Sequence, residues 1–201
     1  PTPASTPAPT AAPAPADALT PEEKIGQLFI IRPDALDLTL PQESINDAKA
    51  DGVTMLTDAM RETLQAYPVG GICQFGKNIT DPEQLAQFNA DLQAASRTPL
   101  FIAVDEEGGA VARLANPPAF DLPQYESAAV VGASGDPADA CAMGQTIGAY
   151  LKEYGFNMDF APDADVNTNP DNPIIGTRAF SSDAATAAEM AAAAADGLRT
   201  G

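Results

Sequence analysis

The chain of 201 residues contains no histidine, no tryptophan and only two cysteines. Without histidine, the chain by itself cannot form a Ser-His or Cys-His nucleophile system or a His-ligated zinc site. Two cysteines are too few for a four-thiolate metal site. These absences exclude a large set of catalytic and metal-dependent functions for the chain taken alone.

Positive charge is also scarce, because 10 Lys and Arg stand against 28 Asp and Glu, giving a formal net charge of −18. The basic residues are scattered singly, whereas nucleic acids and anionic membranes require clustered cations that offset phosphates. No apolar run approaches the roughly 18 residues that a membrane-spanning helix needs. We therefore expect no nucleic-acid partner and no membrane span. The hydrophobic content of 45% is enough for a real core and excludes wholesale disorder.

The first 16 residues consist of Pro, Ala, Thr and Ser alone. Such a segment cannot seed a core, and its proline content favours extended polyproline II. We predict a disordered Pro/Ala/Thr-rich linker over residues 1–17 and a folded domain over residues 18–201. Either the linker is an untethered terminus, or it is a semi-rigid spacer behind a removed signal or anchor. The second alternative predicts a secreted or surface-tethered protein.

Apolar runs alternate with helical patterns along residues 18–201. The runs predict strands at residues 28–31, 70–75, 100–104 and 156–160. Helices are predicted from residue 20, at 42–50, at 57–67, from 80 to 95, at 136–153 and from 182 to a stop at Gly197. This alternation indicates an α/β fold built from parallel βαβ units. The two cysteines, Cys73 in a predicted strand and Cys141 in a predicted helix, are interpreted as buried thiols and not as a disulfide.

Polar residues gather after the predicted strands, at the edge where parallel sheets and barrels place their sites. Asp105, Glu106 and Glu107 follow the third strand, then two glycines and Arg113. A carboxylate and an arginine at this spacing suit recognition of several sugar hydroxyls. The alternative is a loop in which the acids pair with arginine and cap the next helix.

The segment after the fourth strand carries Asp159, Asp163 and Asp165, which raise a calcium hypothesis. That hypothesis is weakened by the missing EF-hand spacing and terminal Glu. Alternatively, Asp105 and Asp165 form the acid/base pair of a glycosidase that is complete within 201 residues. Arg178 lies further along, where a lone loop arginine is usually a solvated charge or a structural donor.

Taken together, these segments resemble the N-terminal barrel of glycoside hydrolase family 3, in its β-N-acetylhexosaminidase branch. The matching pieces are residues 21–27, 70–72, 101–113, 155–167 and 172–180. The resemblance implies a (β/α)8 TIM-type barrel, of which this chain supplies roughly the first half. It also implies retaining hydrolysis of terminal β-linked N-acetylglucosamine, with an Asp nucleophile and a separate acid/base, and it implies no cofactor and no metal.

The resemblance assigns substrate binding to Asp105, Arg113 and Arg178, and a loop-holding role to Asp165. Ala110 stands where the family usually has arginine. The family's acid/base loop and nucleophile are expected beyond Gly201, so no catalytic residue is assigned within the chain. We therefore expect the chain alone to be inactive and the remainder of the barrel to come from the same or another chain. The alternative function is a non-catalytic sugar-binding or assembly module on a partial barrel.

Overall fold

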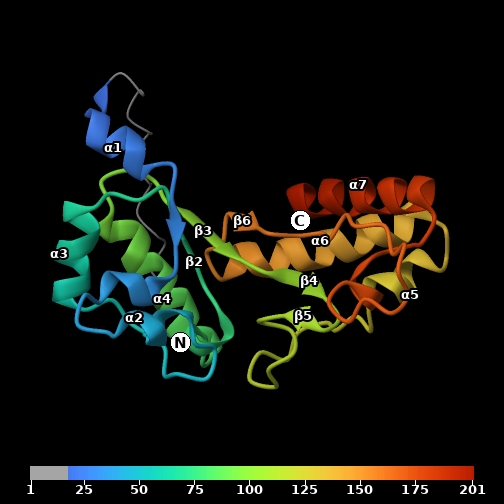
Figure 1. Cartoon of the computed structure of the whole chain (residues 1–201), viewed down its shortest axis with the longest axis horizontal. Coiled ribbons are helices and arrows are strands. Elements are labelled where there is room, and N and C mark those ends of the chain that lie inside the picture. The colour runs from blue at the N-terminus through green and yellow to red at the C-terminus, as the bar shows by residue number, and fades with distance from the viewer. Residues whose placement is uncertain (1–17) are drawn as a thin grey trace, which may run out of the picture.

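A computed structural model describes residues 18–201, so the predicted linker over residues 1–17 lies outside the described residues (Figure 1). Four strands form one parallel sheet in the order β1-β2-β3-β6. They are β1 (Ile30–Ile31), β2 (Gly71–Cys73), β3 (Phe101–Val104) and β6 (Met158–Asp159). The parallel α/β architecture is confirmed, and the strands follow one another across the sheet as in a (β/α) barrel.

The first strand is two residues shorter than predicted. The amides of Leu28 and Phe29 donate to the carbonyls of Ile25 and Gly26, at 3.0 Å each. These residues therefore close the end of α1 (Pro21–Gly26) before the chain enters the sheet. Their apolar side chains are 82% and 55% exposed among the described residues.

Helices lie at both ends of the molecule, with the sheet between them (Figure 1). On one side are α2 (Gln42–Asn46), α3 (Asp58–Ala66) and α4 (Pro82–Ala95), and on the other are α5 (Ala128–Gly132), α6 (Pro137–Glu153) and α7 (Ala184–Thr200). Polar N-caps begin the longer ones, as the sequence predicted, although α4 is capped by Asp81 and not by Thr80. The 3₁₀ turns η2 (Pro33–Leu36), η3 (Gly76–Asn78) and η4 (Gly176–Arg178) join these elements.

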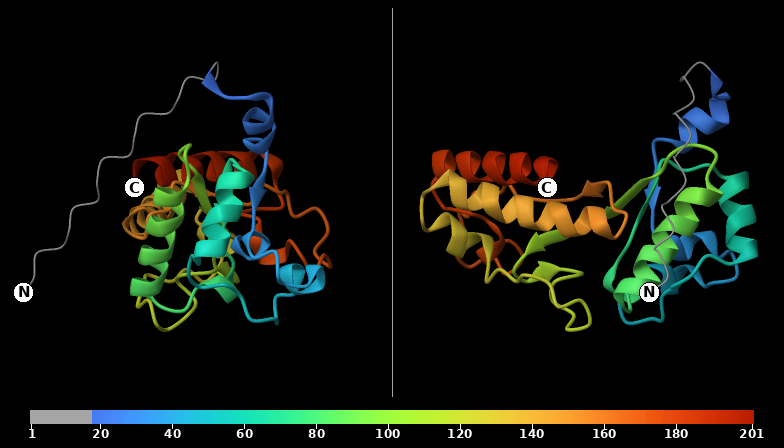
Figure 2. Two further views of the ribbon diagram at one scale, coloured as in Figure 1. Left: turned by 90° about the vertical axis from the view of Figure 1, so that its left-hand side faces the viewer. Right: turned by 180° about the vertical axis from the view of Figure 1, so that it is seen from behind.

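The α6 and α7 helices lie side by side in every view (Figures 1 and 2). Their backbones approach closely, since a Cβ on Gly144 would lie 2.2 Å from the carbonyl oxygen of Ala194. A Cβ on Gly197 would lie 2.1 Å from the carbonyl oxygen of Cys141. The predicted stop at Gly197 is therefore wrong: this glycine serves helix packing, and α7 continues to Thr200.

The buried core joins the sheet to both groups of helices. Its largest fully buried side chains include Met60, Leu64, Ile72, Leu85, Phe88, Leu92, Ile102, Ile147 and Met190. Cys73 and Cys141 are both free thiols, as predicted, but only Cys73 is fully buried. No helix within residues 18–201 is long and apolar enough to cross a membrane.

Candidate functional site

The candidate site lies where β3 and β6 end. Asp105 follows β3 directly, and the chain then forms an antiparallel hairpin of β4 (Glu106–Gly108) and β5 (Val111–Ala112). The sequence did not predict this hairpin. Gly108 and Gly109 turn it with φ values of +82° and +64°, which favour glycine. Because the hairpin reverses the chain direction, Arg113 lies next to the carboxylate of Asp105.

Asp105 and Arg113 form an ion pair. The Nη2 of Arg113 donates to Oδ2 of Asp105 at 3.2 Å, and the two side chains are 33% and 26% exposed. The Nε of Arg113 is buried and has no partner among the described residues. Because both side chains are partly exposed, the pair keeps donors and acceptors that a ligand at the carboxyl end of the sheet can reach.

Arg178 lies on a second acidic cluster of this edge. Its Nε and Nη2 donate to both carboxylate oxygens of Glu107, at 2.8 and 2.7 Å. Asp163 approaches Nε at 3.7 Å. The hydrogen bonds that Arg178 donates to Glu107 hold the pKa of Arg178 above its ordinary value. The alternative prediction had two parts. Its first part, that the loop acids pair with arginine, is confirmed. Its second part, that these acids cap the next helix, is wrong, because the N-cap of α5 is Ser127.

The loop after β6 is held by Asp163. Its Oδ1 accepts the backbone N–H of Asp165 at 2.8 Å, and its side chain is only 3% exposed. Asp165 itself is exposed, and a hydrogen bond with Asp163 raises the pKa of its carboxyl. The loop-holding role expected of Asp165 thus falls mainly to Asp163. No group of three His, Cys, Asp or Glu within residues 18–201 is arranged for a metal, so the calcium hypothesis gains no support.

Two further carboxylates lie next to the Asp105–Arg113 pair, fully buried Glu106 and partly buried Asp159, and the sequence assigned neither to sugar binding. Glu106 is fully buried and accepts four hydrogen bonds, described below. Asp159 accepts the N–H of Glu106 at 3.0 Å, while its second oxygen is buried without a partner. Burial, and then the charges of the neighbouring acids, raise the pKa of Asp159 to about 8. Burial likewise raises the pKa of Cys73 to about 12, which excludes an active thiolate at neutral pH.

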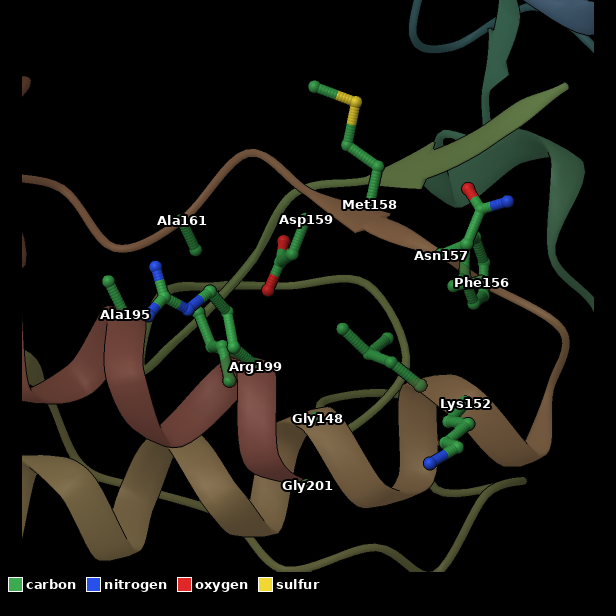
Figure 3. Close-up of a pocket in the computed structure, with 12 residues that line it drawn as sticks. Gly148, Lys152, Phe156, Asn157, Met158, Asp159, Ala161, Ala195, Arg199 and Gly201 are labelled. Atoms are coloured by element: carbon green, nitrogen blue, oxygen red, sulfur yellow. The ribbon is translucent and has the colours of Figure 1, made fainter.

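A cavity of about 520 Å³ lies between β6, α6 and α7 (Figure 3). It is lined mainly by apolar groups, including Leu151, Phe156 and Leu198, with Asp159 at the end of the strand. Asp105, Arg113 and Arg178 do not line it. Within the described part of the chain, no strand pairs with the edge of β6 opposite β3. The cavity therefore borders an open sheet edge and is separate from the candidate sugar site.

Sequence comparisons place this geometry among known proteins. Residues 20–201 match the family profile described as the glycosyl hydrolase family 3 N terminal domain. The chain is 30% identical over 195 residues to beta-hexosaminidase LpqI of Mycobacterium tuberculosis, covering 90% of this chain and 40% of that protein. It is 35% identical over 134 residues to beta-hexosaminidase A of Pseudoalteromonas piscicida, covering 64% of this chain and 22% of that protein.

Solved structures agree with this placement. A family 3 beta-N-acetylglucosaminidase from a Paenibacillus species superposes with a TM-score of 0.75 at 32% identity, covering 90% of this chain and 31% of that one. A beta-N-acetylhexosaminidase from Beutenbergia cavernae gives 0.71 at 30% identity, covering 90% and 51%. The chain thus spans less than half the length of the two curated relatives. Residues 20–201 belong to the N-terminal domain of glycosyl hydrolase family 3.

Proposed function

We propose that this chain supplies the substrate-binding part of a retaining glycosidase that hydrolyses terminal β-linked N-acetylglucosamine. The observation that carries the proposal is the Asp105–Arg113 pair at the carboxyl end of β3, with Arg178 on the same edge. The printed names of the relatives, β-hexosaminidases and β-N-acetylglucosaminidases, support the sugar class.

The proposed binding chemistry follows from the two charged groups. The carboxylate of Asp105 accepts hydrogen bonds from two sugar hydroxyls, while the planar guanidinium of Arg113 donates to their neighbours. Arg178 has both of its Glu107-facing donors occupied, and its Nη1 donates to the carbonyl of Ile174 at 3.3 Å. We therefore assign Arg178 a peripheral binding role, in which its remaining N–H groups reach the substrate.

We further propose that the acid/base, the nucleophile and the remainder of the barrel come from residues beyond Gly201 or from another chain. Two features support this arrangement. The edge of β6 and the apolar cavity beside it are open within the described residues. Leu28, Phe29 and Phe101 are more than half exposed beside β1 and β3. Further strands and helices of a closed barrel would cover such surfaces.

Export is a separate proposal, for a secreted or surface-tethered protein. It is supported by the composition of residues 1–16, which suits a semi-rigid spacer between an anchor and a domain. Fractionation of cells that produce the full-length protein tests it. Recovery in the cytoplasmic fraction alone would overturn it.

Hydrolysis of a chromogenic N-acetyl-β-glucosaminide by the 201-residue chain and by the full-length protein tests the main proposal. We expect turnover only in the full-length protein, with strong loss in its Asp105→Ala variant. Turnover by the short chain would instead favour chemistry by its own carboxylates. Binding of N-acetylglucosamine without turnover by either protein would favour the non-catalytic module.

A further inference from the structure

Glu106 stands next to the sugar-binding aspartate but cannot itself reach a sugar. It is 0% exposed, whereas the side chain of Asp105 is 26% exposed. Burying a carboxylate is costly unless hydrogen bonds replace its water. The groups that donate hydrogen bonds to Glu106 therefore indicate the role of this buried carboxylate.

The carboxylate of Glu106 accepts hydrogen bonds from three consecutive backbone amides. Oε2 accepts from the N–H groups of Arg113 and Leu114, the latter at 2.9 Å, and Oε1 accepts from Ala115 at 2.9 Å. The hydroxyl of Tyr150 on α6 donates to Oε1 at 2.8 Å. One buried side chain thus joins the segment after β5 to α6, through a tyrosine that lies 44 residues from Glu106 in sequence.

We propose that Glu106 is a positioning residue that fixes the backbone of Arg113 so that its guanidinium meets Asp105 and the sugar. This inference rests on the proposed function. The Oε2 of Glu106 accepts a hydrogen bond from the backbone N–H of Arg113 itself. It therefore fixes the backbone position from which the Arg113 side chain extends. A side chain extending from a fixed backbone loses less freedom when it binds a ligand.

A purely structural role is the competing explanation, since Glu106 also anchors α6 through Tyr150. The two roles use different oxygens in part, and variants separate them. Glu106→Gln replaces one acceptor oxygen with an NH2 group that faces N–H donors. Tyr150→Phe removes only the contact with α6 and keeps every amide bond to the loop. Tyr150→Phe is therefore the matched control for stability.

Titration calorimetry of the full-length protein with N-acetylglucosamine gives the test. We expect Glu106→Gln to weaken binding at least fivefold and Tyr150→Phe to change it less than twofold, although both lower the midpoint of thermal unfolding. If Glu106 acts through Arg113, then adding Glu106→Gln to Arg113→Ala weakens binding less than twofold further. If the loss of affinity in the double variant equals the product of the two single-variant losses, the inference is overturned.

Hydrogen exchange of the unaltered protein adds a measurement that does not depend on any variant folding. The amides of Arg113, Leu114 and Ala115 lie outside the helices and the main sheet, yet we expect slow exchange at all three. Rapid exchange there would overturn the inference. If the unaltered protein fails to bind the sugar, the proposed function falls and the inference falls with it. If it binds and only Arg113→Ala weakens binding, the inference alone is wrong.

Discussion

Replacing Asp159 with asparagine should stabilise the protein near and above neutral pH, and increasingly so as the pH rises toward 8. The Asp159 pKa of about 8 lies far above the ordinary value of 3.8, mainly because the group is buried. Near neutral pH the folded protein therefore keeps the proton, whereas the unfolded chain has released it. Since the unfolded state then binds fewer protons, the stability of the unaltered protein falls as the pH rises between about 4 and 8.

The magnitude follows from the difference between the two pKa values. At about 1.4 kcal/mol per pKa unit, the difference destabilises the folded state above pH 8 by an amount on the order of 6 kcal/mol. An asparagine cannot ionise, so it avoids this loss. Its amide nitrogen takes the position of the oxygen that has no partner, which costs about 1–2 kcal/mol. We expect a net gain of roughly 4 kcal/mol at pH 8.5 and a small net loss near pH 4.

Urea unfolding at several pH values measures this difference. Because the chain has no tryptophan, circular dichroism or tyrosine fluorescence is the suitable signal. Asp51→Asn, at an exposed position, controls for the loss of one negative charge. A difference between Asp159→Asn and the unaltered protein that stays constant from pH 4.5 to pH 8.5 would refute the reasoning.

Three further predictions concern the site and the fold. Asp105→Ala should weaken N-acetylglucosamine binding more than Arg113→Ala, since one carboxylate accepts hydrogen bonds from two hydroxyls at about 1.5–3 kcal/mol per charged hydrogen bond. If calorimetry gives both variants the affinity of the unaltered protein, neither residue belongs to the site. Lys77→Met should destabilise the protein by about 3–5 kcal/mol, because it removes one partner of a buried 3.1 Å ion pair and leaves the Asp34 carboxyl fully buried without its cation; urea unfolding measures this. Gly144→Ala should lower stability by about 2–3 kcal/mol by forcing α6 from α7, and an unchanged thermal midpoint would contradict that close contact.

The sheet could be predicted because its signals are local. The apolar run over residues 100–104 lies between Pro99 and Asp105, and β3 occupies residues 101–104 of it. A continuous apolar run is what a strand buried on both faces requires. The end of α7 could not be predicted in this way, since only the packing of Gly197 on α6 shows why a glycine continues the helix.

The sequence predicted which residues form the site better than it predicted which of them contact one another. Asp105 and Arg113 are eight positions apart, and a glycine turn between them favours their meeting. By contrast, Glu107 and Arg178 pair across 71 positions, and no local pattern chooses between Glu107 and its neighbours as the partner. The resemblance to a family located Arg178, but only the folded backbone shows that two of its donors are already occupied.

The acids at 105–107 show why three adjacent carboxylates need the folded structure to acquire separate roles. Along a strand, neighbouring side chains point to opposite faces. Here Asp105 is partly exposed at Arg113, Glu106 is buried on three amides and a tyrosine, and Glu107 is held by Arg178. Each charge is balanced by a different partner, and Asp159 beside them stays protonated near neutral pH. Deprotonation of Asp159 above about pH 8 would add a negative charge next to these acids, so an alkaline rise in pH should disturb the candidate sugar site before it disturbs the core.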